Sequence, residues 1–370
     1  MQQAGLPIDV CFQICAYLPK RDLVALQLVN RTFLAFSTSA LYREASLDER
    51  TAEQLSRTLQ AQEPLRPLVS SLRLSYADSD TTVERSAIDL DKLILPLINY
   101  CTNLRALDID WPDELEVKQG TFFAHLPNLP SITSFRLCVP SGQAPVSRLL
   151  PALRTWAPRL QSLTIQGLCS PKSYTATFDS LDLPVLRRLS LTYCEISDWA
   201  FERLFGNLGK LDDLELDLMV PNAPSDHMVR QVFDLSKVQR LKIEKNWIGS
   251  SESQLGSDLV SKCTPGRLVS LSLSGRIFRS DLLALPQMQC VEELELSWVS
   301  AFSLEDLLDW VKGLDNKPRP SRLRSLTARL IGYEDDLDQE ALQALESFAQ
   351  HQVMSFQAKT LFGSLEAAEE

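Results

Sequence analysis

The sequence repeats one short apolar pattern ten times between Val69 and Leu330. Two variable residues separate a first leucine-type residue from a second, and one separates the second from a third, as in Leu160, Leu163 and Ile165. The copies begin at residues 69, 104, 132, 160, 186, 211, 238, 268, 291 and 323, so the interval ranges from 23 (268 to 291) to 35 (69 to 104). A period of this length predicts a solenoid, in which each repeat buries its apolar side against its neighbours.

Each repeat is expected to contain one strand and, in most cases, one helix. The second and third leucine-type residues alternate with polar residues, which indicates a strand with one buried face. Apolar residues at helical spacing predict helices at 90–100, 146–156, 199–208, 228–233, 281–285, 304–311 and 340–348. Strands and helices that repeat in one direction predict an α/β fold: a curved parallel sheet that lines a horseshoe, with the helices on its outer side.

Two copies resemble the extended signature of leucine-rich repeats. They continue beyond the third leucine-type residue to Cys194 and Ile196, and to Asn246 and Ile248. The resemblance implies that Cys194 and Asn246 lie buried in the turn and bond to the backbone of adjacent turns. The other eight copies lack such a residue, and two of them have a proline there, so we expect a solenoid with irregular turns.

The first forty residues follow a different period. Val10, Ile14 and Leu18 recur at helical spacing after Pro7, which is suited to the first turn of a helix. A second helix is expected after Pro19, with Asp22 as its cap, and a third over 31–42. Three short helices are close to the lower size limit for a core that is stable alone, so this segment is expected to need a partner or a neighbouring domain.

This segment, residues 5–47, resembles an F-box. The matching residues are Leu6, Pro7, Asp9, Val10, Ile14, Leu18, Asp22, Leu23, Leu26, Val29, Arg31, Phe33 and Leu41 to Arg43. An F-box implies contact with an adaptor subunit through an apolar surface. By position in the motif, the resemblance assigns that contact to Leu6, Pro7, Val10, Ile14, Leu18, Leu23, Leu26 and Val29. Some of these residues must instead hold the three helices together.

The chain is accordingly divided into four parts: an F-box at 5–47, a linker helix at 48–68, an irregular leucine-rich-repeat solenoid at 69–356 and a C-terminal tail at 357–370. Ala52, Leu55 and Leu59 give the linker helix one apolar side, and Pro64 and Pro67 end it.

The residues between the buried leucines are expected to form the concave face, where small hydroxyls alternate with charges. Such a surface suits a protein better than a small apolar ligand. The residues proposed for target binding are Arg188, Asp213, Glu215, Arg240, Lys242 and Glu293. In one interpretation Asp213, Glu215 and Asp217, with Glu293 and Glu295, recruit a basic segment of a partner. In the other, which we favour, Arg240 and Lys242 on the next strand neutralise the acidic strand.

Aromatic residues recur two positions after the last leucine-type residue of four strands: Tyr76, Trp111, Tyr193 and Trp298. They could form a row of anchors, because aromatic residues often dominate interface energies. Strand alternation favours packing beneath the loops, since this position points the same way as the buried leucines.

Composition excludes several classes of function. The formal net charge of -11 disfavours binding to nucleic acid or to an anionic membrane, and no stretch has the ~18 apolar residues that a membrane span needs. The eight cysteines are scattered, so we expect buried thiols in a reducing compartment, cytoplasmic and/or nuclear. Only three histidines occur, and no metal-ligand, phosphate-loop or nucleophile motif is found. We expect no catalytic residues, no metal and no cofactor.

The resemblance to F-box proteins with leucine-rich repeats, many fungal ones included, implies a substrate receptor of a Skp-cullin-F-box ubiquitin ligase. Such a subunit binds a Skp-family adaptor, and through it a cullin, and presents a protein target without catalysing a reaction. The alternative is a non-catalytic protein interaction scaffold that acts outside ubiquitination.

Overall fold

The computed structural model describes residues 7–75, 90–110, 121–139, 144–169, 180–218, 220, 223–245, 254–275, 280–297, 304–315, 323–330, 339–351 and 355–360. The chain divides into two compact units, Met1–Leu160 (unit 1) and Gln161–Glu370 (unit 2). Each unit is described by itself. None of the helices in the described ranges is long and apolar enough to span a membrane.

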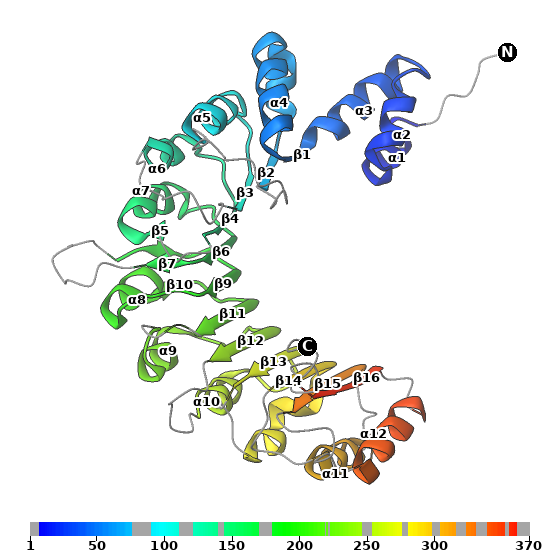
Figure 1. Cartoon of the computed structure of the whole chain (residues 1–370), viewed down its shortest axis with the longest axis vertical. Helices are drawn as coiled ribbons and strands as arrows, with labels where there is room; N and C mark the ends of the chain where they lie inside the picture. The colour runs from blue at the N-terminus through cyan, green and yellow to red at the C-terminus, as the bar shows by residue number, and fades with distance from the viewer. Residues whose placement is uncertain are drawn as a thin grey trace, which may run out of the picture. The chain divides into compact units, whose positions relative to one another are not determined.

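Unit 1 begins with three helices and continues as strand-and-helix repeats (Figure 1). Its elements are α1 (Ile8–Tyr17), α2 (Lys20–Leu26), α3 (Arg31–Arg43), β1 (Glu44–Leu47), α4 (Glu49–Ala61), the 3-10 helix η1 (Glu63–Leu68), β2 (Ser71–Ser75), α5 (Leu90–Tyr100), β3 (Ala106–Asp110), α6 (Thr121–His125), η2 (Leu126–Asn128), β4 (Ser134–Cys138), β5 (Ala144–Pro145) and α7 (Val146–Trp156). Strands β1, β2, β3 and β4 pair in parallel in this order.

Unit 2 continues the same architecture. Its elements are β6 (Ser162–Gln166), β7 (Leu168–Cys169), β8 (Asp182–Leu183), β9 (Arg188–Thr192), α8 (Asp198–Phe205), β10 (Asn207–Leu208), β11 (Asp213–Leu218), α9 (Asp226–Val232), β12 (Arg240–Lys245), α10 (Leu255–Lys262), β13 (Ser270–Ser274), η3 (Ser280–Ala284), η4 (Pro286–Cys290), β14 (Glu293–Ser297), α11 (Leu304–Asp315), β15 (Ser325–Leu330), α12 (Gln339–His351) and β16 (Ser355–Thr360). Strands β6, β9 and β11 to β16 form a parallel sheet in sequence order, while β8 and β10 pair separately.

The leucine pattern places its residues in register across each sheet. Leu72, Leu107 and Phe135 face one another on β2, β3 and β4, and Leu189 and Leu214 do so on β9 and β11. All five side chains are at most 1% exposed. Each repeat thus buries its apolar side against the next copy, as the sequence predicts.

A repeated backbone contact fixes this register. The carbonyl oxygen of Gln161 accepts hydrogen bonds from the N–H groups of Arg187 and Arg188, at 2.9 and 3.0 Å. Equivalent pairs of hydrogen bonds are found at the start of β3, β4, β11, β12, β13, β14 and β15. Because one carbonyl oxygen accepts hydrogen bonds from two consecutive N–H groups of the next repeat, neighbouring strands start in the same register.

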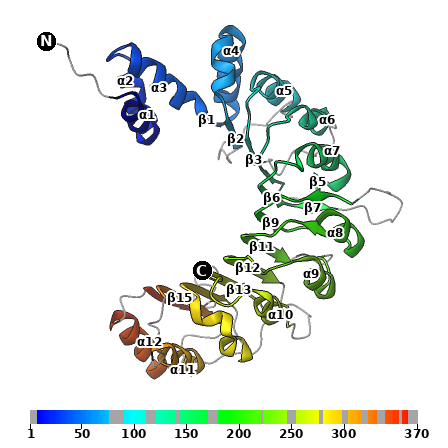
Figure 2. The ribbon, with the colours of Figure 1, turned by 180° about the vertical axis from the view of Figure 1, so that it is seen from behind.

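Helices α8, α9 and α10 lie on one side of strands β9, β11 and β12 in both views (Figures 1 and 2). The other side carries no helix from the described part of unit 2. We call it the open face of unit 2; its side chains come from the positions between the buried leucines.

The sheet extends beyond the predicted solenoid at both ends. Strand β1 pairs with β2 although it lies within the predicted F-box boundary, so α4 connects two strands of the sheet rather than acting as a separate linker. Strand β16 pairs with β15 and continues to Thr360, beyond the predicted end at residue 356. Neither β1 nor β16 contains two spaced leucines, which is why the pattern misses them.

The helix predictions hold at several places and fail at others. Helices α5 and α7 have the predicted bounds. Helices α6 and α10 are not predicted, and the segment predicted at 281–285 is the 3-10 helix η3. Helix α10 nevertheless has buried Leu255, Leu259 and Val260 at helical spacing.

Candidate binding surfaces

Helices α1, α2 and α3 form a small domain with a thin interior. Only Cys11, Cys15, Leu23 and Ser37 are buried among residues 7–43. Phe12 packs edge-on against the ring of Phe36, with centroids 6.1 Å apart. Four buried residues are a small core for three helices, and the need for a partner stays a prediction.

Local hydrogen bonds define the start of α3. The side chain of Asn30 accepts hydrogen bonds from the N–H groups of Thr32 and Phe33, both at 3.0 Å. It therefore satisfies two N–H groups that have no partner inside the helix. The predicted cap Asp22 makes no such bond, because α2 begins earlier, at Lys20 after Pro19, and places Asp22 in its first turn.

The same domain leaves large apolar side chains exposed. Ten large apolar side chains are exposed in the described part of the chain, and eight of them lie between residues 8 and 34. These eight are Ile8, Val10, Phe12, Tyr17, Val24, Leu28, Val29 and Leu34, called the N-terminal apolar residues below. Tyr17 and Leu28 are each 89% exposed. Apolar exposure concentrated in one small domain indicates an interaction site.

The residues predicted to bind an adaptor have different environments. Leu6 lies outside the described residues. Pro7, Val10 and Val29 are exposed, and Ile14, Leu18 and Leu26 are half-buried. Leu23 is only 3% exposed, so it packs in the interior of the domain and is not part of an exposed surface.

Six exposed apolar residues were not predicted: Ile8, Phe12, Tyr17, Val24, Leu28 and Leu34. The F-box motif specifies only certain spaced positions, so it makes no prediction for the apolar residues that lie between them. Leu28 follows α2 in a turn, where helical spacing gives no information.

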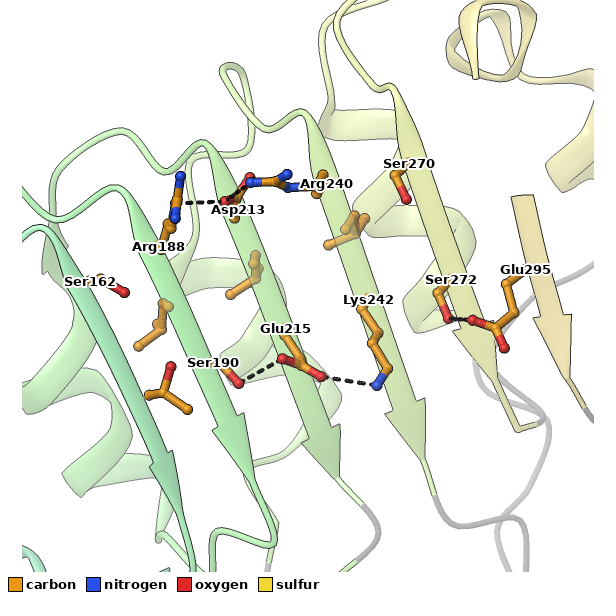
Figure 3. A pocket seen from close by; sticks show the side chains of 14 residues that line it. Ser162, Arg188, Ser190, Asp213, Glu215, Arg240, Lys242, Ser270, Ser272 and Glu295 are labelled. Atoms are coloured by element: carbon orange, nitrogen blue, oxygen red, sulfur yellow. Dashed lines mark hydrogen bonds and ion pairs between the residues drawn. The ribbon is translucent and has the colours of Figure 1, made fainter. Parts of the chain in front are cut away.

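An ion-pair cluster lies on the open face of unit 2 (Figure 3). Asp213 on β11 stands opposite Arg188 on β9 and Arg240 on β12. Its carboxylate binds Nε of Arg188 at 3.0 Å, and Nε and Nη2 of Arg240 at 2.9 and 2.5 Å. The hydrogen bond and the charge of Asp213 raise the pKa of Arg240, and the charge of Glu293 adds to the effect.

The next residues along these strands form a second group. Glu215 accepts hydrogen bonds from the Ser190 hydroxyl at 2.7 Å and from Lys242 Nζ at 3.0 Å. Lys242 also lies 3.1 Å from Glu244. Burial alone would lower the pKa of Lys242, but the hydrogen bonds and charges of Glu215 and Glu244 outweigh it, so the pKa is raised.

Of the two interpretations of the acidic strand, the geometry favours neutralisation. Asp213 and Glu215 are both paired with the neighbouring basic strand, and Asp217 is only 5% exposed. Arg188 was not predicted as a partner of Asp213, although the one-to-one register brings the two together. A role of these residues in target binding stays a prediction.

A shallow hollow lies on the same part of the open face. Its volume is about 530 Å³, and its lining residues come from β6, β9, β11, β12, β13 and β14. Besides the charged residues above, hydroxyl groups line it: Ser162, Thr164, Ser190, Ser270 and Ser272. Ser272 donates a hydrogen bond to Glu295 at 3.0 Å.

Unit 1 has a related cluster. Nη1 of Arg136 on β4 lies 2.8 Å from carboxylate oxygens of both Asp108 and Asp110 on β3. Arg73 on β2 approaches the same two residues, at 3.5 and 3.7 Å. Two arginines therefore share two carboxylates.

The turn after β9 contains the extended repeat signature. Cys194 is buried, and its Sγ lies 3.3 Å from the Thr192 carbonyl and 3.6 Å from that of Ile165, as the resemblance implies. Burial raises the pKa of this thiol to about 12. Asn246, its counterpart in the other repeat, lies outside the described residues.

Tyr193 differs from the prediction. Its side chain is 47% exposed and its φ is 51°, so it does not pack beneath a loop. A positive φ redirects the chain, which is why strand alternation fails there. The other aromatic residues of the series, Tyr76, Trp111 and Trp298, lie outside the described residues. Within the described ranges, no group of histidine, cysteine and acidic residues is arranged to hold a metal ion.

The fold and these surfaces define a leucine-rich-repeat protein preceded by a small helical domain with exposed apolar residues. Residues 4–48 match the F-box-like family, so this chain carries an F-box-like domain ahead of its repeats. The chain is also similar in structure to a chain in the crystal structure of the Rad7 and Elc1 complex in yeast, with 15% identity over 90% of both chains and a TM-score of 0.48. No curated protein matches the sequence. These comparisons indicate no enzyme family.

Proposed function

We propose that this protein is the substrate-recognition subunit of a Skp-cullin-F-box ubiquitin ligase. Its F-box-like domain would bind a Skp-family adaptor, and through it a cullin, while the repeats bind a protein target. The observation that carries the proposal is the exposure of eight large apolar side chains on an F-box-like domain with a thin interior. We place this role in the cytoplasm and/or nucleus.

Apolar burial supports the adaptor contact. Fully burying a side chain such as that of Leu28 stabilises a complex by roughly 1.5–3 kcal/mol before the costs of association. Several such residues in one small domain provide a strong driving force for binding. The same burial would also stabilise the domain itself, because a partner that binds only the folded form shifts its folding equilibrium.

The proposed contribution to ubiquitination is proximity. A chain that holds both an adaptor and a target raises the effective concentration of the target beside the catalytic module. This role requires two binding surfaces on one chain and no catalytic group.

The adaptor contact is tested with Tyr17→Asp combined with Leu28→Asp. Both side chains are almost fully exposed, so the free chain is expected to fold normally, while two charges would enter an apolar interface. We expect binding of a purified Skp-family adaptor, measured by calorimetry, to weaken at least 100-fold. The matched control is Val185→Asp, an exposed apolar residue of unit 2. Unchanged affinity in the double variant, with normal helix content by circular dichroism, would refute the adaptor contact.

A second experiment separates a receptor from a scaffold. A receptor should co-purify with a cullin, and proteins bound to its repeats should accumulate when the chain is removed from cells. If the adaptor binds but neither result is found, the chain is a scaffold that acts outside ubiquitination.

A further inference from the structure

The two arginine clusters share a pattern but differ in charge balance. In unit 1, Arg73 and Arg136 flank Asp108, and Asp110 lies two residues further along the same strand. Both arginines reach both carboxylates, which gives two cations and two anions. The cluster is neutral and complete.

In unit 2 the corresponding second acidic residue pairs with other side chains. Arg188 and Arg240 flank Asp213, and Glu215 lies two residues further along β11. Glu215 binds Lys242 and Ser190 instead of the arginines. Two guanidinium groups therefore share one carboxylate, which leaves an excess of one positive charge around Asp213 itself. Glu293 stands in the same row, two strands beyond Arg240, and its negative charge also acts on Arg240.

This excess charge is accessible. The side chains of Arg188 and Arg240 are 65% and 59% exposed, whereas that of Asp213 is 19% exposed. Arg188 contacts Asp213 through Nε, and Arg240 through Nε and Nη2. Each guanidinium has five N–H donors, so donors of both groups have no partner among the described residues. Asp213 holds the two groups in place, which lowers the entropic cost of binding a further anion.

Tyr193 gives the same strand a second unusual feature. Gly167 after β6 and Gly275 after β13 occupy the equivalent position and have φ values of 78° and 98°. Glycine is the usual residue for such a conformation, and a tyrosine there is strained. The strain presents an exposed aromatic ring at the end of β9. Arg188 and Tyr193 are separated by five residues, or ~17 Å of extended chain.

We propose that the open face of unit 2 binds an extended segment of a protein target that inserts an aspartate or glutamate between Arg188 and Arg240 and packs an apolar residue on Tyr193. The inference deepens the proposed function, on which the identity of the segment as a target depends. A single carboxylate would neutralise the cluster and reproduce the balance seen in unit 1.

Two features further restrict the sequence of the peptide segment that can bind. Lys242 is shared between Glu215 and Glu244, so the excess charge further along the strands is negative. The acidic residue is therefore expected at one end of the segment only. Hydroxyl groups in the hollow, such as those of Thr164 and Ser270, suit the peptide groups of an extended chain.

The test uses a displayed library of random eight-residue peptides, selected on the full-length chain. We expect enrichment of aspartate or glutamate near one end and of an apolar or aromatic residue about five positions away. Arg188→Gln should abolish the acidic preference, and it keeps the pair between Asp213 and Arg240, so the fold is preserved. The matched control is Arg187→Gln, which removes the same charge from the adjacent residue, an exposed partner of Asp212. This control should select the same peptides as the unaltered chain.

Synthetic copies of the most enriched peptide complete the test. Replacing its acidic residue with glutamine should weaken binding about tenfold in fluorescence anisotropy, because a charge-assisted hydrogen bond is lost. Enrichment of basic residues, or an unchanged acidic preference in Arg188→Gln, would overturn the inference. Tighter binding of a phosphoserine peptide would overturn the assignment to a carboxylate.

The outcome is independent of the adaptor experiment. Arg188→Gln should bind the Skp-family adaptor normally, because Arg188 lies outside the F-box-like domain. If the unaltered chain does not bind the adaptor but still selects these peptides, the ligase role is rejected and the site on the open face is kept. The reverse result would reject the site alone.

Discussion

The N-terminal helices and the repeats use apolar residues in opposite ways. Between residues 7 and 43, four residues are buried and eight large apolar side chains are exposed. In the repeats, leucines such as Leu163, Leu189 and Leu214 are at most 1% exposed. A repeat always has a neighbouring copy that covers its apolar side, whereas the three short helices are not part of such a series. The repeats therefore obtain their stability from within the chain, and we expect the helical domain to obtain part of its stability from a partner.

The largest expected effect tests the repeat side of this comparison. Trp156 is fully buried against Phe135, with ring centroids 5.0 Å apart, and its Nε1 donates a hydrogen bond to the Leu129 carbonyl at 2.7 Å. Trp156→Ala should lower the free energy of unfolding by about 4 kcal/mol, because it leaves a large cavity. Leu28→Ala should change it by less than about 0.5 kcal/mol, because that side chain is exposed. Urea denaturation followed by circular dichroism measures both.

Trp156→Phe is the control for that comparison. It keeps an aromatic ring but leaves the buried Leu129 carbonyl without its partner, so an intermediate loss of about 1–3 kcal/mol is expected. If Leu28→Ala destabilised the chain as much as Trp156→Ala, the contrast between the two regions would be wrong.

A substitution at the N-terminal cap of α3 tests the stability of the helical domain. Asn30→Ala removes two hydrogen bonds from the start of the helix and should destabilise it by about 1 kcal/mol. In a domain of low stability, this change should speed amide hydrogen exchange in α1 to α3 about fivefold. Exchange in β9 to β12 should not change.

Asp48→Ala is the matched control for this experiment. Asp48 caps α4 within a reciprocal capping box with Thr51, at the start of the repeats. Its removal should affect α4 and leave α1 to α3 unchanged. An adaptor that binds the N-terminal apolar residues should slow exchange in α1 to α3 in both variants. Exchange that is slow in those helices without any adaptor would show that the domain is stable alone.

Most of the sheet could be predicted because one rule determines it. The leucine pattern alternates buried and exposed positions, and copies in register must align, so the strands and the pairing of Asp213 with Arg240 follow from the sequence. Strands β1 and β16 could not be found this way. Only Leu47 of β1 is buried, so that strand carries too little apolar signal.

The candidate sites were less predictable, for two physical reasons. Whether a residue such as Leu23 or Val24 is exposed depends on how three helices pack, and the spacing within one helix does not determine that packing. The charge imbalance around Asp213 depends on which cation pairs with Glu215. Both Arg188 and Lys242 are on neighbouring strands. A side-chain preference of this kind has no sequence signature.

The smallest expected effect concerns Tyr193, one of the two exposed large apolar residues in the described repeats. Tyr193→Gly should raise the free energy of unfolding by about 0.5–1 kcal/mol, because glycine adopts a positive φ without strain, even though it adds entropy to the unfolded chain. Tyr193→Ala removes the same ring but keeps the strain, so it should not stabilise the chain. Both should weaken peptides selected on the open face. Greater stability together with weaker binding in Tyr193→Gly would show that the repeats, like the helices, expose an apolar residue for a partner; stabilisation by both variants would mean that the ring, rather than the backbone, is the unfavourable feature.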